Sequence, residues 1–159
     1  MKKLNKDDFI MTVQWGIFGL LVITSLIKKY HIFTVLKPYG FILIGLGFVL
    51  IVFSNIAHGS VNKSQLSAYP QPNLNAKLVT KGIYSYVRHP IYCGFIFISF
   101  GTAFAVGNLL SIIVAILSLC FYYFKSSFEE KRLLQVYSQY SNYRKVTGRF
   151  LPKINMFSS

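Results

Sequence analysis

Residues 82–94 read GIYSYVRHPIYCG, a polar, basic and aromatic stretch that leads directly into an apolar run ending at Val106. Soluble proteins rarely place such a cluster at the start of an apolar segment. Ionisable groups at membrane depth cost free energy and are usually retained for function. The stretch therefore predicts a helix that enters a bilayer, with a site for a polar ligand at the lipid boundary.

The composition supports a membrane setting for the whole 159-residue chain. Hydrophobic residues make up 53% and charged residues 13%, whereas a soluble domain carries about 25% charged residues. The 17 Lys and Arg against 4 Asp and Glu give a net charge of +13. These cations lie between apolar runs and form no single stripe, so we expect them to set membrane orientation and not to bind nucleic acid. Cys93 and Cys120 have no metal-ligand spacing, so we expect no metal site and no disulfide framework.

Four apolar runs determine the predicted architecture, at residues 10–27, 39–57, 91–106 and 109–124. A straight transmembrane helix needs about 20 residues, so the first two runs are long enough and the last two are slightly short. Only Gly107-Asn108 separates the last two, which predicts a tight antiparallel helical hairpin. The predicted fold class is therefore an all-α integral membrane protein with about four transmembrane helices.

The segment after the last run is predicted to form an amphipathic cytoplasmic helix over residues 126–147. Gly148 can end this helix, and Pro152 prevents it from resuming. Its apolar positions recur at helical spacing: Leu133, Leu134, Tyr137, Tyr140 and Tyr143.

The charge of the loops predicts how the chain is oriented in the membrane. With four spans, the N-terminus, the 58–90 loop and the tail share one side, and nearly all Lys and Arg lie there. Lys28, Lys29 and Lys37 lie on the other side. Positive residues favour the cytoplasmic side, so we expect both termini in the cytoplasm. The Lys-, Ile-, Asn- and Phe-rich composition indicates a bacterial plasma membrane.

Arg88-His89-Pro90 is the first group that indicates ligand chemistry. Pro90 favours an extended conformation at His89 and is tolerated in the first turn of a helix. His89 then lies beside a helix N-terminus, where free N–H groups attract an anion such as a carboxylate. Interfacial cations and the aromatic belt of a membrane protein are the alternative explanation. Three tyrosines whose rings can attract a cation flank the group: Tyr84, Tyr86 and Tyr92.

Glu129-Glu130 and two tail arginines, Arg144 and Arg149, form the second group. A Glu can hold a ligand ammonium, and Arg can grip a carboxylate through two hydrogen bonds. The alternatives are ion pairs on a helix surface for the acids and attraction to anionic lipid for the arginines. The two adjacent Glu point about 100° apart on a helix, so we expect only one of them to face a pocket.

The order of these groups is more specific than any one of them. Residues 78–94 (LVTKGIYSYVRHPIYCG), a short hairpin, residues 129–134 (EEKRLL) and residues 140–152 (YSNYRKVTGRFLP) together resemble the isoprenylcysteine carboxyl methyltransferase family. Phospholipid methyltransferases are similar through the same region. The resemblance covers residues 40–153 and implies an integral membrane methyltransferase that uses S-adenosylmethionine.

Matching to the family's motifs implies a role for each candidate residue. The cofactor would contact Lys81, Gly82, Ile83, Tyr84, His89, Tyr92, Glu129 and Glu130. Arg88, Glu130 and Arg149 would serve catalysis, and Arg144 and Arg149 would bind the substrate. A single membrane domain would cover residues 1–159, with two N-terminal spans (1–57), a cytoplasmic loop carrying the cofactor motif (58–90), the hairpin (91–124) and a cytoplasmic C-terminal segment (125–159).

The chemistry of S-adenosylmethionine agrees with these residue types. Its carboxylate suits His89 at a helix start, its ammonium suits a Glu, and its sulfonium suits tyrosine rings. Methyl transfer needs positioning and desolvation more than acid–base catalysis, and an acceptor carboxylate is already ionised at neutral pH. We expect O-methylation of a carboxylate or hydroxyl on a small lipophilic acceptor that enters from the bilayer, and thiol or amino-lipid acceptors stay open.

Two other functional classes remain as alternatives. A membrane reductase of the sterol reductase type has a similar C-terminal hairpin and tail, and it would bind NADPH instead. A non-catalytic membrane protein would bind neither cofactor and would tolerate His89→Ala and Glu130→Ala.

Overall fold

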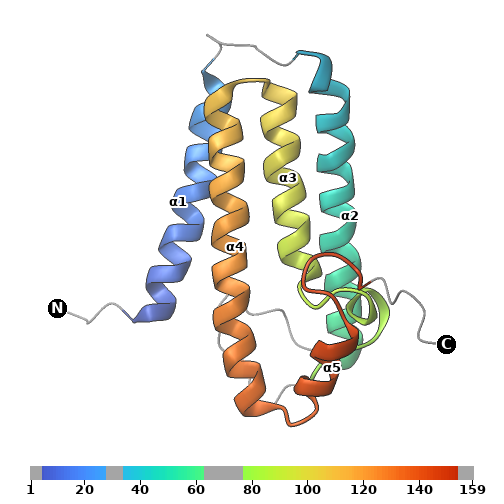
Figure 1. Ribbon diagram of the computed structural model, residues 1–159. Helices are drawn as coiled ribbons and strands as arrows, with labels where there is room; N and C mark the ends of the chain where they lie inside the picture. Colours follow the sequence, from blue (N-terminus) through green and yellow to red (C-terminus); the bar gives the residue numbers. More distant parts are fainter. Residues whose placement is uncertain (1–4, 28–33, 63–76, 154–159) are drawn as a thin grey trace.

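The structure is a computed structural model that describes residues 5–27, 34–62 and 77–153. Within these ranges the chain is helical, apart from loops and one isolated β-bridge. The elements in chain order are α1 (Lys6–Leu26), η1 (Thr34–Leu36), α2 (Lys37–Asn62), η2 (Gly82–Ser85), α3 (Pro90–Val106), α4 (Leu109–Val136) and α5 (Tyr140–Val146). Figure 1 shows the four long helices side by side, with α5 at the end of the bundle where α3 begins.

All four predicted apolar runs are helices, which confirms the all-α prediction for the described residues. Three of these helices, α1, α2 and α4, are long and apolar enough to cross a membrane. The fourth, α3, has 17 residues and is a shorter apolar helix. The predicted hairpin is also present, because Gly107 ends α3 in the left-handed conformation at φ 73° and Asn108 caps α4 by accepting a hydrogen bond from the Ser111 amide.

Glycines set the distance between α2 and α3. A Cβ on Gly47 would lie 2.6 Å from the Gly94 carbonyl oxygen, and one on Gly101 would lie 2.7 Å from the Gly40 carbonyl oxygen. The two pairs let the helix backbones touch, as small residues do in membrane bundles. Gly45 faces open space and plays no part in this contact. The close approach holds α2 against α3, the helix at whose start the RHP motif lies.

Polar side chains join α1 to α4 at three levels along the antiparallel pair. Near the start of α1, Asp7 forms an ion pair with Arg132 at 2.8 Å. In the middle, the Lys125 ammonium donates to Gln14 Oε1 at 2.5 Å. At the far end, the Ser111 hydroxyl donates to Thr24 Oγ1 at 3.3 Å, and Asn108 donates to the Thr24 carbonyl at 2.8 Å.

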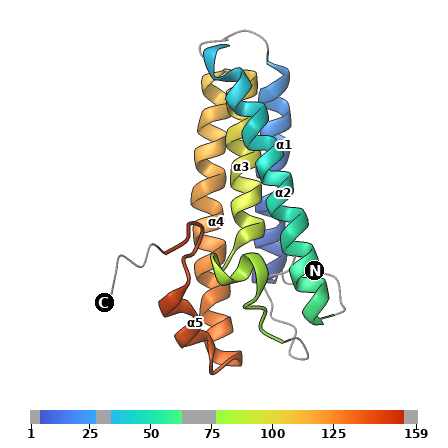
Figure 2. The same cartoon turned by 90° about the vertical axis from the view of Figure 1, so that its right-hand side faces the viewer.

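The prediction of a separate tail helix over 126–147 is wrong in its boundaries. The helix that contains the fourth apolar run does not end at residue 124. It continues as α4 to Val136, and the chain turns at Tyr137 before α5 begins. Two tertiary contacts explain the difference. Lys125 stays inside the bundle because Gln14 of α1 accepts its hydrogen bond. The turn folds α5 back so that Tyr140 becomes 1% exposed, and Figure 2 shows α5 beside the loop that precedes α3.

Candidate functional site

The loop before α3 and the segment after α5 are joined through their backbones. Val87 and Gly148 form a parallel bridge. The Arg88 amide donates to the Gly148 carbonyl at 2.8 Å, and the His89 amide donates to the Arg149 carbonyl at 3.1 Å. Gly148 is required here, since a Cβ would lie 1.6 Å from the Leu151 carbonyl oxygen. The bridge brings the RHP motif and the tail arginines to one place.

Glu130 of α4 is the centre of the charged cluster that results. Its side chain is 2% exposed, and Arg88 Nε donates to Oε1 at 2.9 Å. His89 Nε2 lies 3.2 Å from the same oxygen. The second oxygen, Oε2, lies 3.3 Å from Arg149 and 3.4 Å from Arg144. A carboxylate so deeply buried is tolerable only when paired in this way, and it holds α4, the loop before α3 and the tail together.

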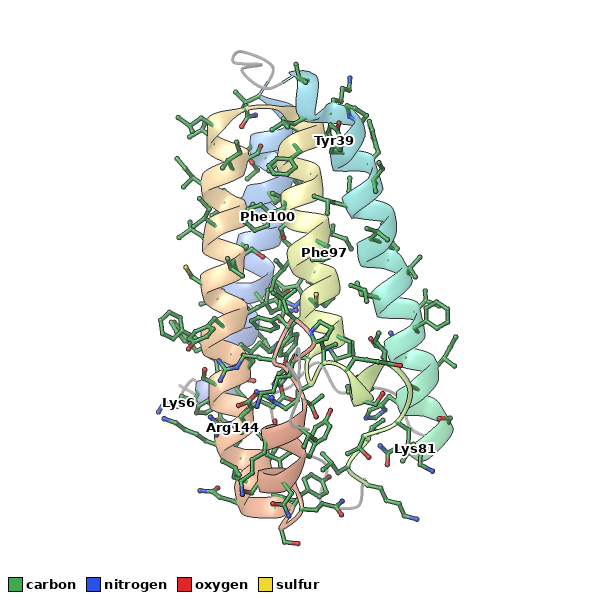
Figure 3. The ribbon with its side chains drawn as sticks, turned by 45° about the vertical axis from the view of Figure 1, so that its right-hand side comes forward. Lys6, Tyr39, Lys81, Phe97, Phe100 and Arg144 are labelled. Atoms are coloured by element: carbon green, nitrogen blue, oxygen red, sulfur yellow. The ribbon has the colours of Figure 1, made fainter. Side chains whose placement is uncertain are left out.

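Arg88 extends the cluster into the backbone of the tail. Its guanidinium donates to the Thr147 carbonyl and, at 3.3 Å, to the Arg144 carbonyl. The side chain is 7% exposed. Arg144 differs, because 48% of its side chain is accessible and it is free to reach beyond the cluster. Figure 3 places Arg144 and Lys81 at the same end of the bundle, opposite the end that holds Tyr39.

Glu129 has a different environment from its neighbour. Its side chain is 26% exposed, and the Tyr92 hydroxyl donates to Oε2 at 2.8 Å. His89 Nδ1 lies 3.7 Å from that oxygen. Among the described residues, no side chain forms a hydrogen bond or ion pair with the other oxygen, Oε1. His89 therefore lies between the two acids, and its ring stacks on Tyr92 with centroids 5.3 Å apart and planes 2° apart.

The start of α3 has the geometry expected from the sequence. His89 is the residue before the helix and Pro90 occupies its first turn. The His89 side chain points to Glu129 and Glu130, however, and not to an empty anion site. The backbone at the helix start still has the positive end of the helix dipole.

Buried and half-buried tyrosines lie where the tail packs against the loop before α3. The Tyr143 hydroxyl donates to the Tyr84 carbonyl at 2.6 Å. Burial raises the pKa of Tyr84 above its usual value, and the charge of Glu129 raises it further. Burial likewise raises the pKa of Tyr140 and Tyr143. All three hydroxyls are therefore neutral at physiological pH.

The predicted cofactor segment from Lys81 to Tyr84 forms η2 and the residue before it. Gly82 has φ 62°, a conformation that favours glycine. Lys81 borders a hollow of about 440 Å³ between the end of α2 and the turn that leads into α5. The other lining residues are Val61, Lys77, Leu78, Thr80, Tyr137 and Gln139. Among the described residues no three His, Cys, Asp or Glu side chains gather as a metal ion would need.

Comparison with known proteins identifies the family. The model of the phospholipid methyltransferase family matches residues 35–140, which is more than half of the chain. The chain belongs to this family. It therefore shares its central region, from η1 to the start of α5, with proteins of this family, and this region includes the RHP motif and Glu129-Glu130.

Curated proteins similar to this chain are also methyltransferases. The chain is 36% identical over 104 residues to the protein-S-isoprenylcysteine O-methyltransferase of Schizosaccharomyces pombe, which is 64% of this chain and 39% of that protein. It is 30% identical over 116 residues to the methanethiol S-methyltransferase of Pseudomonas deceptionensis, which is 70% of this chain and 43% of that protein. The chain thus matches about two fifths of the length of these relatives.

A solved structure has the same fold. It is that of the eukaryotic intramembrane Ras methyltransferase isoprenylcysteine carboxyl methyltransferase, with a TM-score of 0.64 and 24% identity. The match covers 94% of this chain and 54% of that one. Together with the curated relatives, it confirms the resemblance to isoprenylcysteine carboxyl methyltransferases.

The structure brings most of the residues predicted from the family motifs into one cluster. Its members are Arg88, His89, Tyr92, Glu129, Glu130, Arg144 and Arg149. Lys81, Gly82 and Ile83 make no contact with the charged side chains among the interactions of the described residues, and Lys81 lines the hollow instead. Tyr86 is 63% exposed and stands apart from the cluster.

Sequence reasoning missed Lys125 and Gln14. Lys125 is 3% exposed, and its ammonium lies 5.2 Å from the centre of the Tyr92 ring. A signal was present, because Lys125 precedes Glu129 by four residues and so lies on the same helix face. Gln14 gave a weaker signal, because it is the only residue with an amide side chain in the first apolar run.

Proposed function

We propose that this protein is a membrane methyltransferase that uses S-adenosylmethionine to methylate a lipophilic acceptor. The observation that carries the proposal is the contrast between the two acids. Both oxygens of Glu130 are paired with arginines. Glu129 is partly exposed, and one of its oxygens is open to a ligand beside Tyr92 and His89. The named activities of the curated relatives, all methyltransferases, support the same class.

The residues fit the cofactor's functional groups. Glu129 would hold the ammonium through its open oxygen, and His89 and Tyr92 would orient that carboxylate from the other side. Arg144, which is the most accessible arginine of the cluster, suits a carboxylate on the cofactor or the acceptor. Residues Lys81 to Tyr84, of which Lys81 lines the hollow of about 440 Å³, are proposed to contact the nucleoside.

Glu130 then has a supporting role. It fixes Arg88, Arg149 and Arg144 around the site, and so it acts on the ligands through these arginines. This assigns the cofactor's ammonium to Glu129, the choice that adjacency alone left open. Arg88 and Arg149 would line the reaction space, with Arg149 also able to contact the acceptor.

The protein's contribution to the reaction is positioning and exclusion of water. S-adenosylmethionine supplies a methyl group already activated on its sulfonium. The cluster orients the two reactants in line, and the apolar helices keep water away from them. An ionised acceptor needs no general base, so none of these residues has to move a proton.

The charges of the site favour an acceptor that is negative. Three arginines and Lys125 surround two glutamates, which leaves an excess of positive charge. A carboxylate acceptor would be attracted, whereas an ammonium acceptor would be repelled. O-methylation of a carboxylate is therefore our leading proposal. The three long apolar helices support an integral membrane location, and we propose that the charged end faces the cytoplasm because most described cations lie there.

Calorimetric titration of the detergent-purified protein with S-adenosylhomocysteine tests the proposal. We expect saturable binding by the wild type and by Asp8→Asn, a control at an exposed acid of α1 that takes part in none of the cluster's ion pairs. Glu129→Gln should weaken binding about tenfold or more, the loss expected for a charge-assisted hydrogen bond. Absence of binding by a folded, monodisperse wild type would refute the proposal. NADPH would then be titrated, because binding of NADPH would favour the reductase alternative.

A further inference from the structure

Lys125 is a buried cation in an apolar helix, and the charged cluster described above does not account for it. We propose that Lys125 is a positioning residue for Tyr92 and Glu129, and that Gln14 of α1 holds Lys125 in place. This inference rests on the proposed function, since Tyr92 and Glu129 are assigned there to cofactor binding. The inference gives α1 a role in ligand binding, although α1 lies outside the family match over residues 35–140.

The first support is the cost of burying Lys125. The residue is 3% exposed and lies within α4, one of the helices long and apolar enough to cross a membrane. Removing an ammonium from water is expensive, so buried lysines in such helices mark functional sites by default. Its polar contacts include Gln14 Oε1 at 2.5 Å, and its ammonium also faces the Tyr92 ring at 5.2 Å. Lys125 therefore joins α1 and α3 at the level of the site.

The second support is the way the Tyr92 ring is held. Lys125 and His89 both pack on this ring, and Tyr122 lies against it with ring centroids 5.2 Å apart. The ring position determines where its hydroxyl points, and that hydroxyl donates to Glu129 at 2.8 Å. A change in the ring's packing would thus move the hydrogen bond that orients Glu129.

The third support is a second route from α1 to the same ring. Phe18 of α1 packs edge-on against Phe95, with centroids 5.5 Å apart. Phe95 stacks on Tyr122 at 5.7 Å, and Tyr122 contacts Tyr92. Two independent chains of contacts therefore connect α1 to Tyr92, one polar and one aromatic.

The competing explanation is that Gln14 and Lys125 only fasten α1 to α4. Thr24 and Ser111 do this at the far end of the same helix pair, where no ligand-binding residue lies nearby. That contact provides the matched control, because Thr24→Val removes a buried α1–α4 hydrogen bond without touching the site.

The test compares Lys125→Met and Gln14→Leu with Thr24→Val in the full-length protein. We expect all three to lower the thermal unfolding midpoint. Only Lys125→Met and Gln14→Leu should weaken S-adenosylhomocysteine binding, by about tenfold for the loss of a contact to a charged group. Lys125→Arg, which keeps a cation over the Tyr92 ring, should retain most of the affinity. Equal affinity in Lys125→Met and wild type would overturn the inference.

A swapped pair separates fastening from positioning. The double variant Gln14→Lys with Lys125→Gln can remake the hydrogen bond, but it moves the cation to α1. We expect the swap to recover the unfolding midpoint and not the affinity. Recovery of both the unfolding midpoint and the affinity would show that Lys125 only joins α1 to α4 and does not position Tyr92.

A readout without the cofactor keeps the inference testable if the proposed function fails. The ring carbon that bears the hydroxyl of Tyr92 can be followed by NMR after ¹³C-tyrosine labelling, with its signal identified by Tyr92→Phe among the 11 tyrosines. We expect this signal to shift in Lys125→Met and to stay in place in Thr24→Val. An unshifted signal in Lys125→Met would refute the positioning role whether or not the wild type binds S-adenosylhomocysteine.

Discussion

Glu129 and Glu130 are neighbours in the chain, yet their carboxylates have very different surroundings in the structure. Glu130 is 2% exposed and meets Arg88, Arg144 and Arg149. Glu129 is 26% exposed, accepts a hydrogen bond from Tyr92 and lies 3.7 Å from His89. One acid is held by three arginines, and we propose that the other receives the ligand.

Replacing each acid should therefore have a different effect. Glu130→Gln leaves the buried Arg88 guanidinium without its counter-charge, which should cost about 3 kcal/mol or more of stability. Glu129→Gln should change stability by less than about 1 kcal/mol, as for a partly exposed pair, while weakening ligand binding. Denaturant or thermal unfolding in detergent measures the first effect, and calorimetry measures the second. Equal destabilisation by the two variants would contradict this division.

Gly148→Ala should detach the tail from the loop before α3. The added methyl would lie 1.6 Å from the Leu151 carbonyl oxygen, so the backbone must move and the bridge to Val87 must break. Hydrogen exchange of the Arg88 and His89 amides, which donate to carbonyls of the tail, reports the detachment. We expect much faster exchange at both amides.

Gly59→Ala is the control for that experiment. Gly59 lies in α2, and its Cβ would meet nothing within 4 Å. Alanine there should be neutral or stabilising, because Gly is unfavourable in a helix by about 1 kcal/mol. Unchanged exchange in Gly148→Ala would mean that the bridge does not hold the tail.

The sequence predicted the parts of the fold and site that depend on local signals. Gly107 and Asn108 end one helix and cap the next, and Pro90 starts α3 beside His89. The motif order also brought the two acids and the tail arginines to the same site as His89. These features follow from backbone conformation and from a motif already known as a unit.

What could not be predicted depends on contacts between distant segments. A lysine after an apolar run normally marks the end of a span, whereas Lys125 lies inside the bundle, where Gln14, 111 residues earlier, accepts its hydrogen bond. The division of labour between Glu129 and Glu130 likewise depends on where the tail folds. No local pattern states which face of α4 meets α1 and which meets the tail.

The glycines of α2 should differ in their tolerance of a methyl group. Gly47→Ala places a Cβ 2.6 Å from the Gly94 carbonyl oxygen, so α2 and α3 must separate. Overpacking of this kind costs about 1–3 kcal/mol. Gly45→Ala is the matched control, because its Cβ meets nothing within 4 Å. Thermal unfolding of both variants in the same detergent should show a lower midpoint for Gly47→Ala alone.

Alkaline pH should loosen the tail through its buried tyrosines. Burial raises the pKa of Tyr84, Tyr140 and Tyr143 above the usual tyrosine value of about 10. The folded state therefore holds these protons more tightly than the unfolded state. The resulting stability is fully present below about pH 10 and is lost as the pH rises further, because each tyrosinate would have to be buried. Tail release, followed by proteolysis after α4, should accelerate above about pH 10. Tyr143→Phe removes one of these ionisations, so its release should begin at a higher pH than in the wild type, although it loses the hydrogen bond to the Tyr84 carbonyl. A release rate that is flat with pH in both proteins would contradict the role of the buried hydroxyls.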